Sequence, residues 1–298
     1  ILPMPQDRRH HKVRRNGGGG DVFIPVIIIL LVITILSLII AFAWQKWQDI
    51  YDPDYLYPGD RSSSSSQSES SSSEASSSSV ESSSEPESSA VAFGQPVPES
   101  ERVTSAYFDD AVFIGDSLTT GIQLYNILPD TTVLASVGIN INNIFTNEVI
   151  SDGNGGQQTI LDAAKDIQPA KIYTMLGTNG LKGLGPEETV RYYRQLVQQL
   201  KADHPDSIIY VQSLMPINEE IFAANYGYEL TNAEIDECNE LLMQMAGEEE
   251  VYFVNCAEAI KDENGELPAE FTTDGLHFRG EYYNKWIDYL KEHTVPEA

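Results

Sequence analysis

A long serine-rich segment divides this chain and decides where a folded domain can lie. Residues 62–89 contain 19 serines and five glutamates and almost no apolar side chain. Such a segment cannot bury enough apolar surface to offset the entropy that is lost on ordering it. We therefore expect a disordered Ser/Glu-rich linker over residues 45–101 and one folded domain over residues 102–298 of the 298-residue chain.

An uncharged apolar run precedes this linker. Residues 22–44 carry no charged side chain, and a helix of this length would extend about 34 Å, enough to cross a bilayer. Residues 1–21 hold five basic side chains, which predicts a cytoplasmic tail, a single-pass membrane anchor and an extracellular domain. The alternative is a cleaved signal peptide that releases the domain, because residues 41–43 (AFA) have the small-x-small form of a processing site.

The part of the chain after this run is strongly acidic. It holds 13 basic and 43 acidic residues, a net charge of −30, which repels phosphate backbones and predicts that nucleic acid is not a partner. Its two cysteines, Cys238 and Cys256, either form a disulfide or stay as buried thiols, and their spacing does not decide between these. No His-Glu-x-x-His motif and no cysteine pair with ligand spacing occurs, so we expect neither a metal nor a cofactor.

Short apolar runs alternate with longer amphipathic stretches from about residue 102 onward. This alternation predicts an α/β domain, in which helices cover both sides of a parallel five-stranded sheet. The expected strands are the runs AVFIG (111–115), TVLASVG (132–138), KIYTMLG (171–177), SIIYVQSLMP (207–216) and VYFVNC (251–256), all buried on both faces. The expected helices are residues 117–127, 157–167, 186–203, 232–247 and 281–293.

Polar or small residues follow three of the predicted strands. Ser117 comes directly after the first strand, Gly138 ends the second, and Asn179 follows the third. The carboxyl ends of parallel strands share one edge of a sheet, so these residues can meet there although they are far apart in sequence. By itself, a serine between a strand and a helix is either an exposed nucleophile or a helix cap.

A serine nucleophile needs a neighbouring base to take its proton, and histidine is the usual one. Two of the five histidines lie in the predicted tail, His204 lies at a helix end on the opposite edge of the sheet, and His293 lies near the chain end. His277 therefore remains as the candidate base for Ser117. Asp274, three residues earlier, can accept a hydrogen bond from its second ring nitrogen and so set the tautomer.

Four blocks of this chain together resemble the GDSL or SGNH hydrolases, a family named after its Ser, Gly, Asn and His residues. The resemblance covers about residues 107–293 and rests on GDSL at 115–118, Gly138 within SVGIN, GTN at 177–179 and DGLH at 274–277. It implies a three-layer α/β/α fold with a flavodoxin-like sheet. One departure is Gly180, where many members carry Asp after the block asparagine.

The resemblance also implies a role for each motif residue. Ser117 would be the nucleophile and His277 the general base, oriented by Asp274. The oxyanion hole would be formed by the Ser117 backbone N–H together with Gly138 and Asn179.

These inferences together predict an extracellular, membrane-tethered serine esterase. We expect it to form an acyl-enzyme and to remove small acyl groups, acetyl above all, from cell-wall or other carbohydrate. One alternative is an O-acetyltransferase that passes the same acyl group to a sugar hydroxyl. Another is a lipase or lysophospholipase, although residues 217–230 are less apolar than a lid would be. The third is a wall-binding module with a dead site, against which the complete motif set argues.

Overall fold

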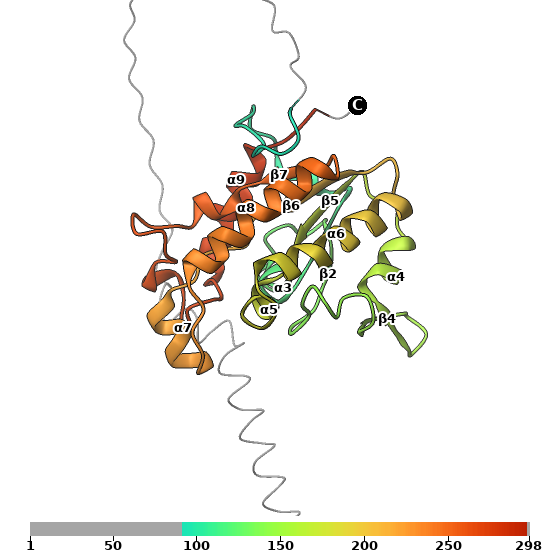
Figure 1. Ribbon diagram of the computed structural model, residues 1–298. Helices are drawn as coiled ribbons and strands as arrows, with labels where there is room; N and C mark the ends of the chain where they lie inside the picture. Colours follow the sequence, from blue (N-terminus) through green and yellow to red (C-terminus); the bar gives the residue numbers. More distant parts are fainter. Residues whose placement is uncertain (1–90, 297–298) are drawn as a thin grey trace, which may run out of the picture. The chain divides into compact units, whose positions relative to one another are not determined.

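The computed structural model describes residues 91–296, drawn in colour in Figure 1. The predicted cytoplasmic tail (1–21), the predicted membrane anchor (22–44) and most of the predicted linker lie outside the described residues. Within residues 91–296, no helix is both long enough and apolar enough to cross a bilayer.

A five-stranded parallel sheet runs through the domain (Figure 1). Its strands lie in the order β2-β1-β5-β6-β7, and each neighbouring pair is parallel. This is the flavodoxin-like order, in which the chain reverses its direction of travel across the sheet after the second strand. The predicted fold class is thus confirmed. Each strand lies in one predicted run: β1 (Ala111–Gly115), β2 (Thr132–Ala135), β5 (Lys171–Met175), β6 (Ile208–Gln212) and β7 (Tyr252–Val254).

Helices cover both faces of this sheet, as the alternation predicts. Helices α6 and α8 lie side by side on one face (Figure 1). Helices α3 and α9 lie together on the other, where the Tyr283 hydroxyl donates to the Leu118 carbonyl at 2.9 Å. The α-helices of the described residues are α3 (Ser117–Leu124), α4 (Ile160–Lys165), α5 (Thr178–Leu184), α6 (Pro186–Asp203), α7 (Glu219–Tyr226), α8 (Asn232–Glu248) and α9 (Tyr283–Lys291). Four short 3-10 helices join them: η1 (Ser105–Phe108), η2 (Cys256–Ala259), η3 (Ala269–Phe271) and η4 (Gly280–Tyr282).

Several local predictions are wrong. The first part of the predicted helix 157–167 is a strand, β4 (Gln157–Thr159), which pairs with β3 (Glu148–Ser151) in an antiparallel hairpin. Helices α5 and α7 were not predicted, because each is short. Strand β2 is not buried on both faces, since it lies at the sheet edge with Thr132 exposed and its other residues half-buried.

An aromatic ladder crosses the middle of the sheet and holds the register of its strands. Phe113, Tyr173, Tyr210 and Tyr252 are partners on adjacent strands. Their ring centroids are 4.8, 4.4 and 5.8 Å apart in that order. Aromatic pairs of this kind add about 0.5–1.5 kcal/mol each beyond the area they bury. A fixed register brings the ends of β1 and β5, which carry Ser117 and Asn179, to the same edge.

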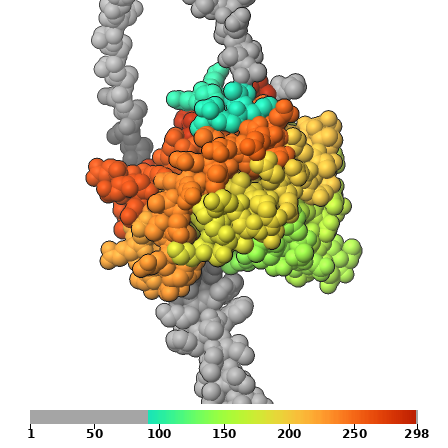
Figure 2. Space-filling view, viewed as in Figure 1, coloured from blue at the N-terminus to red at the C-terminus, as the bar shows by residue number. Residues whose placement is uncertain are grey.

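The folded domain begins before residue 102, inside the range predicted as linker. Val97 is 1% exposed, and its backbone N–H donates to the Phe253 carbonyl of β7 at 2.8 Å. The backbone N–H groups of Ser100 and Val103 donate to carbonyls at the end of α9, at 2.6 and 2.9 Å. Figure 2 shows this teal segment lying against the orange α8. Val97 is flanked by Pro96 and Pro98, which are typical of a linker, so the sequence did not mark it as a core residue.

The two cysteines are free thiols. Cys238 in α8 and Cys256 in η2 are both buried and form no disulfide. Burial raises the pKa of each thiol to about 12. They are therefore protonated core residues, the second of the two alternatives that their spacing left open.

Candidate active site

The β1–α3 turn presents the Ser117 side chain at the carboxyl edge of the sheet. All five residues of β1 are buried, and Ser117 is the first residue of α3. The helix cap is its neighbour Asp116, whose Oδ1 accepts from the Leu118 backbone N–H at 3.0 Å. Because Asp116 already accepts from the backbone N–H at the helix start, the half-buried Ser117 hydroxyl is not needed as a cap and can bind another partner.

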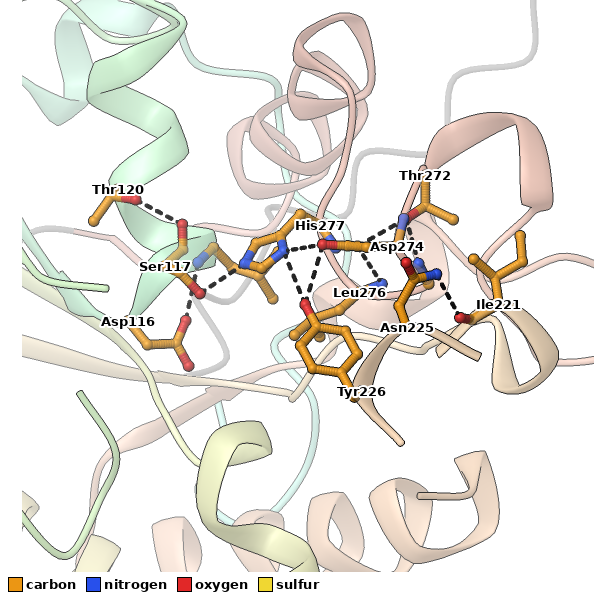
Figure 3. A network of polar contacts seen from close by, with 12 residues as sticks. Asp116, Ser117, Thr120, Ile221, Asn225, Tyr226, Thr272, Asp274, Leu276 and His277 are labelled. Carbon is orange, nitrogen blue, oxygen red and sulfur yellow. Dashed lines mark hydrogen bonds and ion pairs between the residues drawn. The ribbon is translucent and has the colours of Figure 1, made fainter. Parts of the chain in front are cut away.

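That partner is His277, 160 positions later in the chain. Its Nε2 lies 2.8 Å from Ser117 Oγ, and its Nδ1 lies 2.7 Å from Asp274 Oδ2 (Figure 3). Both residues lie on the loop between η3 and η4, whose base is closed by an antiparallel bridge between Thr272 and Phe278. The structure thus joins the serine, histidine and aspartate of the sequence prediction in one hydrogen-bonded chain.

The Asp274 carboxylate is held by donors on both of its oxygens. Oδ1 accepts from the backbone N–H groups of Leu276 and His277, each at 2.9 Å, and from the Thr272 hydroxyl at 3.3 Å. Burial alone would raise the pKa of Asp274, but the hydrogen bond and charge of His277 and these backbone donors outweigh it and hold the pKa well below its usual range. The carboxylate is therefore ionised at neutral pH and can accept from the imidazole.

The two remaining motif residues lie beside the β1–α3 turn. Asn179, near the start of α5, donates from Nδ2 to the Ile139 carbonyl at 2.9 Å and lies 3.5 Å from Asp116 Oδ2. Gly138, the neighbour of Ile139, is exposed, and no atom lies within 4 Å of the place where a Cβ would stand. Its φ of +79° is one that glycine adopts without strain. Asn179 thus connects the Gly138 loop to the turn that carries Ser117.

Comparison with known proteins places this site in a family. Residues 113–285 match the model of the GDSL-like lipase/acylhydrolase family. The chain belongs to this family. The description of the family as lipases and acylhydrolases matches the geometry of Ser117, His277 and Asp274.

Individual members and solved structures share only part of their sequence with this chain. It is 31% identical over 140 residues to the isoamyl acetate-hydrolysing esterase of Saccharomyces cerevisiae, a match that covers 44% of this chain and 58% of the yeast protein. The chain therefore spans less than two thirds of that relative. A solved structure from Streptococcus pneumonia, described as a platelet activating factor, has 22% identity and a TM-score of 0.50. The match covers 63% of this chain and 89% of that protein. The structure of a GDSL-like lipase from Bacteroides thetaiotaomicron has 18% identity and a TM-score of 0.47. That match covers 61% of this chain and 85% of the lipase.

Asp116 braces the β1–α3 turn from inside the domain. It is 4% exposed, and burial raises the pKa of its carboxyl to about 6, against the Leu118 N–H and the charge of His277, which lower it. Its two oxygens face the nucleophile helix and Asn179, so its charge lies next to the candidate oxyanion hole.

One residue at the site was not predicted. The hydroxyl of Tyr226, at the end of α7, lies 3.1 Å from Asp274 Oδ2 and 3.4 Å from His277 Nδ1 (Figure 3). In the sequence, residues 217–230 bear only on the question of a lipase lid. An aromatic pair with helical spacing, Phe222 and Tyr226, was the one signal that could have marked it.

Across residues 91–296, no group of three or more His, Cys, Asp or Glu side chains is arranged to hold a metal ion.

Proposed function

We propose that the domain hydrolyses esters of short acyl chains, acetyl above all, through an acyl-enzyme on Ser117. The observation that carries this proposal is the unbroken hydrogen-bonded chain from Ser117 Oγ through His277 to Asp274. In the first step, Ser117 Oγ attacks the ester carbonyl carbon while His277 Nε2 takes the hydroxyl proton. Asp274 stabilises the imidazolium that forms, because its low pKa keeps it ionised.

The negative charge on the substrate oxygen needs donors that are already in place. We assign this role to the backbone N–H of Ser117, at the start of α3, with Gly138 and Asn179. The Asn179 amide keeps one hydrogen bond to the Ile139 carbonyl, and its weaker 3.5 Å contact with Asp116 is the one that an oxyanion would replace. Collapse of the intermediate breaks the ester C–O bond, and His277 returns the proton to the departing alcohol. A water then repeats the sequence and releases the acid.

The choice of short acyl groups rests on two supports. The chain resembles an esterase whose name gives isoamyl acetate as its substrate. The turn at the nucleophile is also built from small residues, Gly115, Asp116 and Ser117. We further propose that the acetyl groups are carried by cell-wall or other carbohydrate.

That carbohydrate assignment depends on where the domain lies. We propose that residues 1–21 are cytoplasmic, that residues 22–44 anchor the chain in the cell membrane, and that a linker ending before Val97 tethers an extracellular domain. The uncharged run and the basic tail before it support this arrangement. Protease treatment of intact cells should remove the domain and leave the tail, whereas full protection of the domain would contradict it.

A panel of p-nitrophenyl esters from acetate to palmitate, run beside acetylated glycans, tests the proposed activity. We expect kcat/KM to be largest for acetate and Ser117→Ala to abolish turnover while the domain stays folded. Fluorophosphonate labelling of the wild-type chain and not of Ser117→Ala would support the same nucleophile. Normal turnover by Ser117→Ala would contradict the assignment, and a preference for palmitate would favour a lipase. Acyl transfer to an added glycan in place of water would favour an acetyltransferase.

A further inference from the structure

Tyr226 lies where the proposed acid and base meet. Its ring stacks on Phe222, one helical turn earlier in α7, with centroids 4.5 Å apart and planes 24° apart. Phe222 is 1% exposed, so this stack fixes the phenol against the core. The Tyr226 hydroxyl is aimed at the contact between Asp274 and His277 (Figure 3).

Helix α7 is fastened to the loop that carries this pair. The backbone N–H of Asn218 donates to the Gly275 carbonyl at 2.9 Å, and the Asn218 side chain caps α7 by accepting from Ile221 N–H. Gly275 has a φ of +88°, and a Cβ there would stand 2.3 Å from the Phe222 nitrogen. Glycine at this position therefore lets the loop touch the first turn of α7. The helix and the loop form one unit that holds the phenol in place.

The chemistry of the three groups in this contact fixes which atom donates to which. An ionised carboxylate only accepts, so the Tyr226 hydroxyl donates its proton to Asp274 Oδ2. A lone pair of the same hydroxyl then faces Nδ1 of His277, at 3.4 Å. This arrangement favours the tautomer with hydrogen on Nδ1, because both nearby oxygens accept from it. That tautomer leaves the Nε2 lone pair directed at Ser117 Oγ.

We propose that Tyr226 is a positioning residue for the ester hydrolysis, which orients Asp274 and sets the basicity of His277 through it. The inference rests on the roles proposed above for Ser117, His277 and Asp274. The phenol has two effects on the carboxylate. It fixes Oδ2 in line with the imidazole, and it spreads part of the negative charge that would otherwise stabilise imidazolium.

Other ionisable groups also face this pair and stay constant in the test. Asp116 from the β1–α3 turn interacts with the charge of His277, and Tyr283 from α9 interacts with Asp116 and Asp274. Neither lies in α7, so removing the Tyr226 hydroxyl leaves both in place.

Tyr226→Phe is the direct test, because it deletes the hydroxyl and keeps the stacked ring. Tyr228→Phe is its matched control. Tyr228 is 39% exposed against 38% for Tyr226 and packs edge-on against the same Phe222. Within the described residues, however, its hydroxyl makes no hydrogen bond to the proposed triad. Both variants and the wild type would be assayed with p-nitrophenyl acetate from pH 5 to 9, with circular dichroism to check folding.

We expect Tyr226→Phe to lower kcat about 10- to 100-fold with KM within about twofold, as for loss of a hydrogen bond to a charged group. The acidic limb of its pH–rate profile should move to higher pH, because the less dispersed carboxylate charge stabilises imidazolium. Tyr228→Phe should match the wild type in both respects. An unchanged kcat and profile in Tyr226→Phe would overturn the inference, as would a change confined to KM, which marks a substrate contact. If the wild type itself hydrolyses no ester, the proposed function fails instead.

Discussion

The two edges of the sheet each hold a histidine, and the two side chains have opposite surroundings. On the carboxyl edge, the His277 side chain is 35% exposed and both of its ring nitrogens are hydrogen-bonded. On the amino edge, His204 caps the end of α6 and is only 3% exposed. Among the described residues, neither of its ring nitrogens has a hydrogen-bond partner. Burial lowers the pKa of His204, although the charge of Asp203 opposes this.

This contrast shows how the surroundings of a histidine decide whether its ring serves as core packing or as a base. An unpartnered, buried imidazole is held in its neutral form and behaves as part of the core. A partly exposed imidazole between a carboxylate and a hydroxyl has its tautomer set and one nitrogen directed at a proton it can take. The hydrogen-bond partners of the ring, more than its depth of burial, therefore identify the proposed base.

The largest expected effect tests this distinction directly. His277→Ala should lower kcat/KM for p-nitrophenyl acetate by at least about 10⁴-fold, as removal of the base does in serine hydrolases. His204→Leu should stay within about threefold of the wild type, because leucine replaces a ring that makes no hydrogen bond and touches nothing in the site. Initial rates at pH 8 and 20 °C would be compared, with circular dichroism as the folding control.

Similar losses in both variants would break the comparison. They would mean that His204 affects activity by stabilising the sheet that carries the site. The choice of His277 as the base would then not follow from a comparison of the histidines.

A smaller effect is expected at Asn179, which lies on the same edge as His277 but transfers no proton in the proposed mechanism. Asn179→Ala should lower kcat about 10²- to 10³-fold if its amide donates to the oxyanion. KM should change little, because the interaction is made in the transition state. Thr178→Ser, a neighbouring change in the same turn, serves as the control. A loss below tenfold would assign Asn179 to the turn alone, through its bond to the Ile139 carbonyl.

Sequence patterns predicted the strands and the larger helices well, since these depend on local composition. The range 186–203 matches α6 residue for residue, where Pro186, Glu187 and Glu188 favour a helix start. The strand order required the resemblance to a family as well, because alternation alone does not choose an order. Helix α7 escaped prediction because it is short and its apolar side chains do not form one continuous stripe.

Contacts made only by tertiary packing could not be predicted from sequence. Tyr226 meets Asp274 across 48 positions, and the contact depends on the close approach of Gly275 to Phe222. The anchoring of Val97 on β7 is of the same kind. The Ser117–His277 contact is also distant in sequence, but the strand ends and the shortage of histidines limited it to one pairing.

The smallest expected effect concerns the stability of the domain and comes from His204. Its pKa is lowered in the folded state, so the unfolded chain binds a proton more readily at this position. This group therefore costs the folded domain no stability above the ordinary histidine pKa of about 6.5. As the pH falls below that pKa, the domain loses stability. Lowering the pH from 7.5 to 5.5 should therefore lower the thermal midpoint of the wild type, measured by circular dichroism, and lower that of His204→Leu less.

Asp116 acts in the opposite direction over the same range. Its folded pKa of about 6 lies above its ordinary value, so the domain loses stability from this group as the pH rises towards about 6, and regains it on acidification. This contribution is common to both chains, and the difference between them isolates His204. Parallel pH dependences in the wild type and His204→Leu would show that the imidazole takes up its proton in the folded domain without cost. The buried ring would then have found a partner, and the contrast between the two edges would rest on His277 alone.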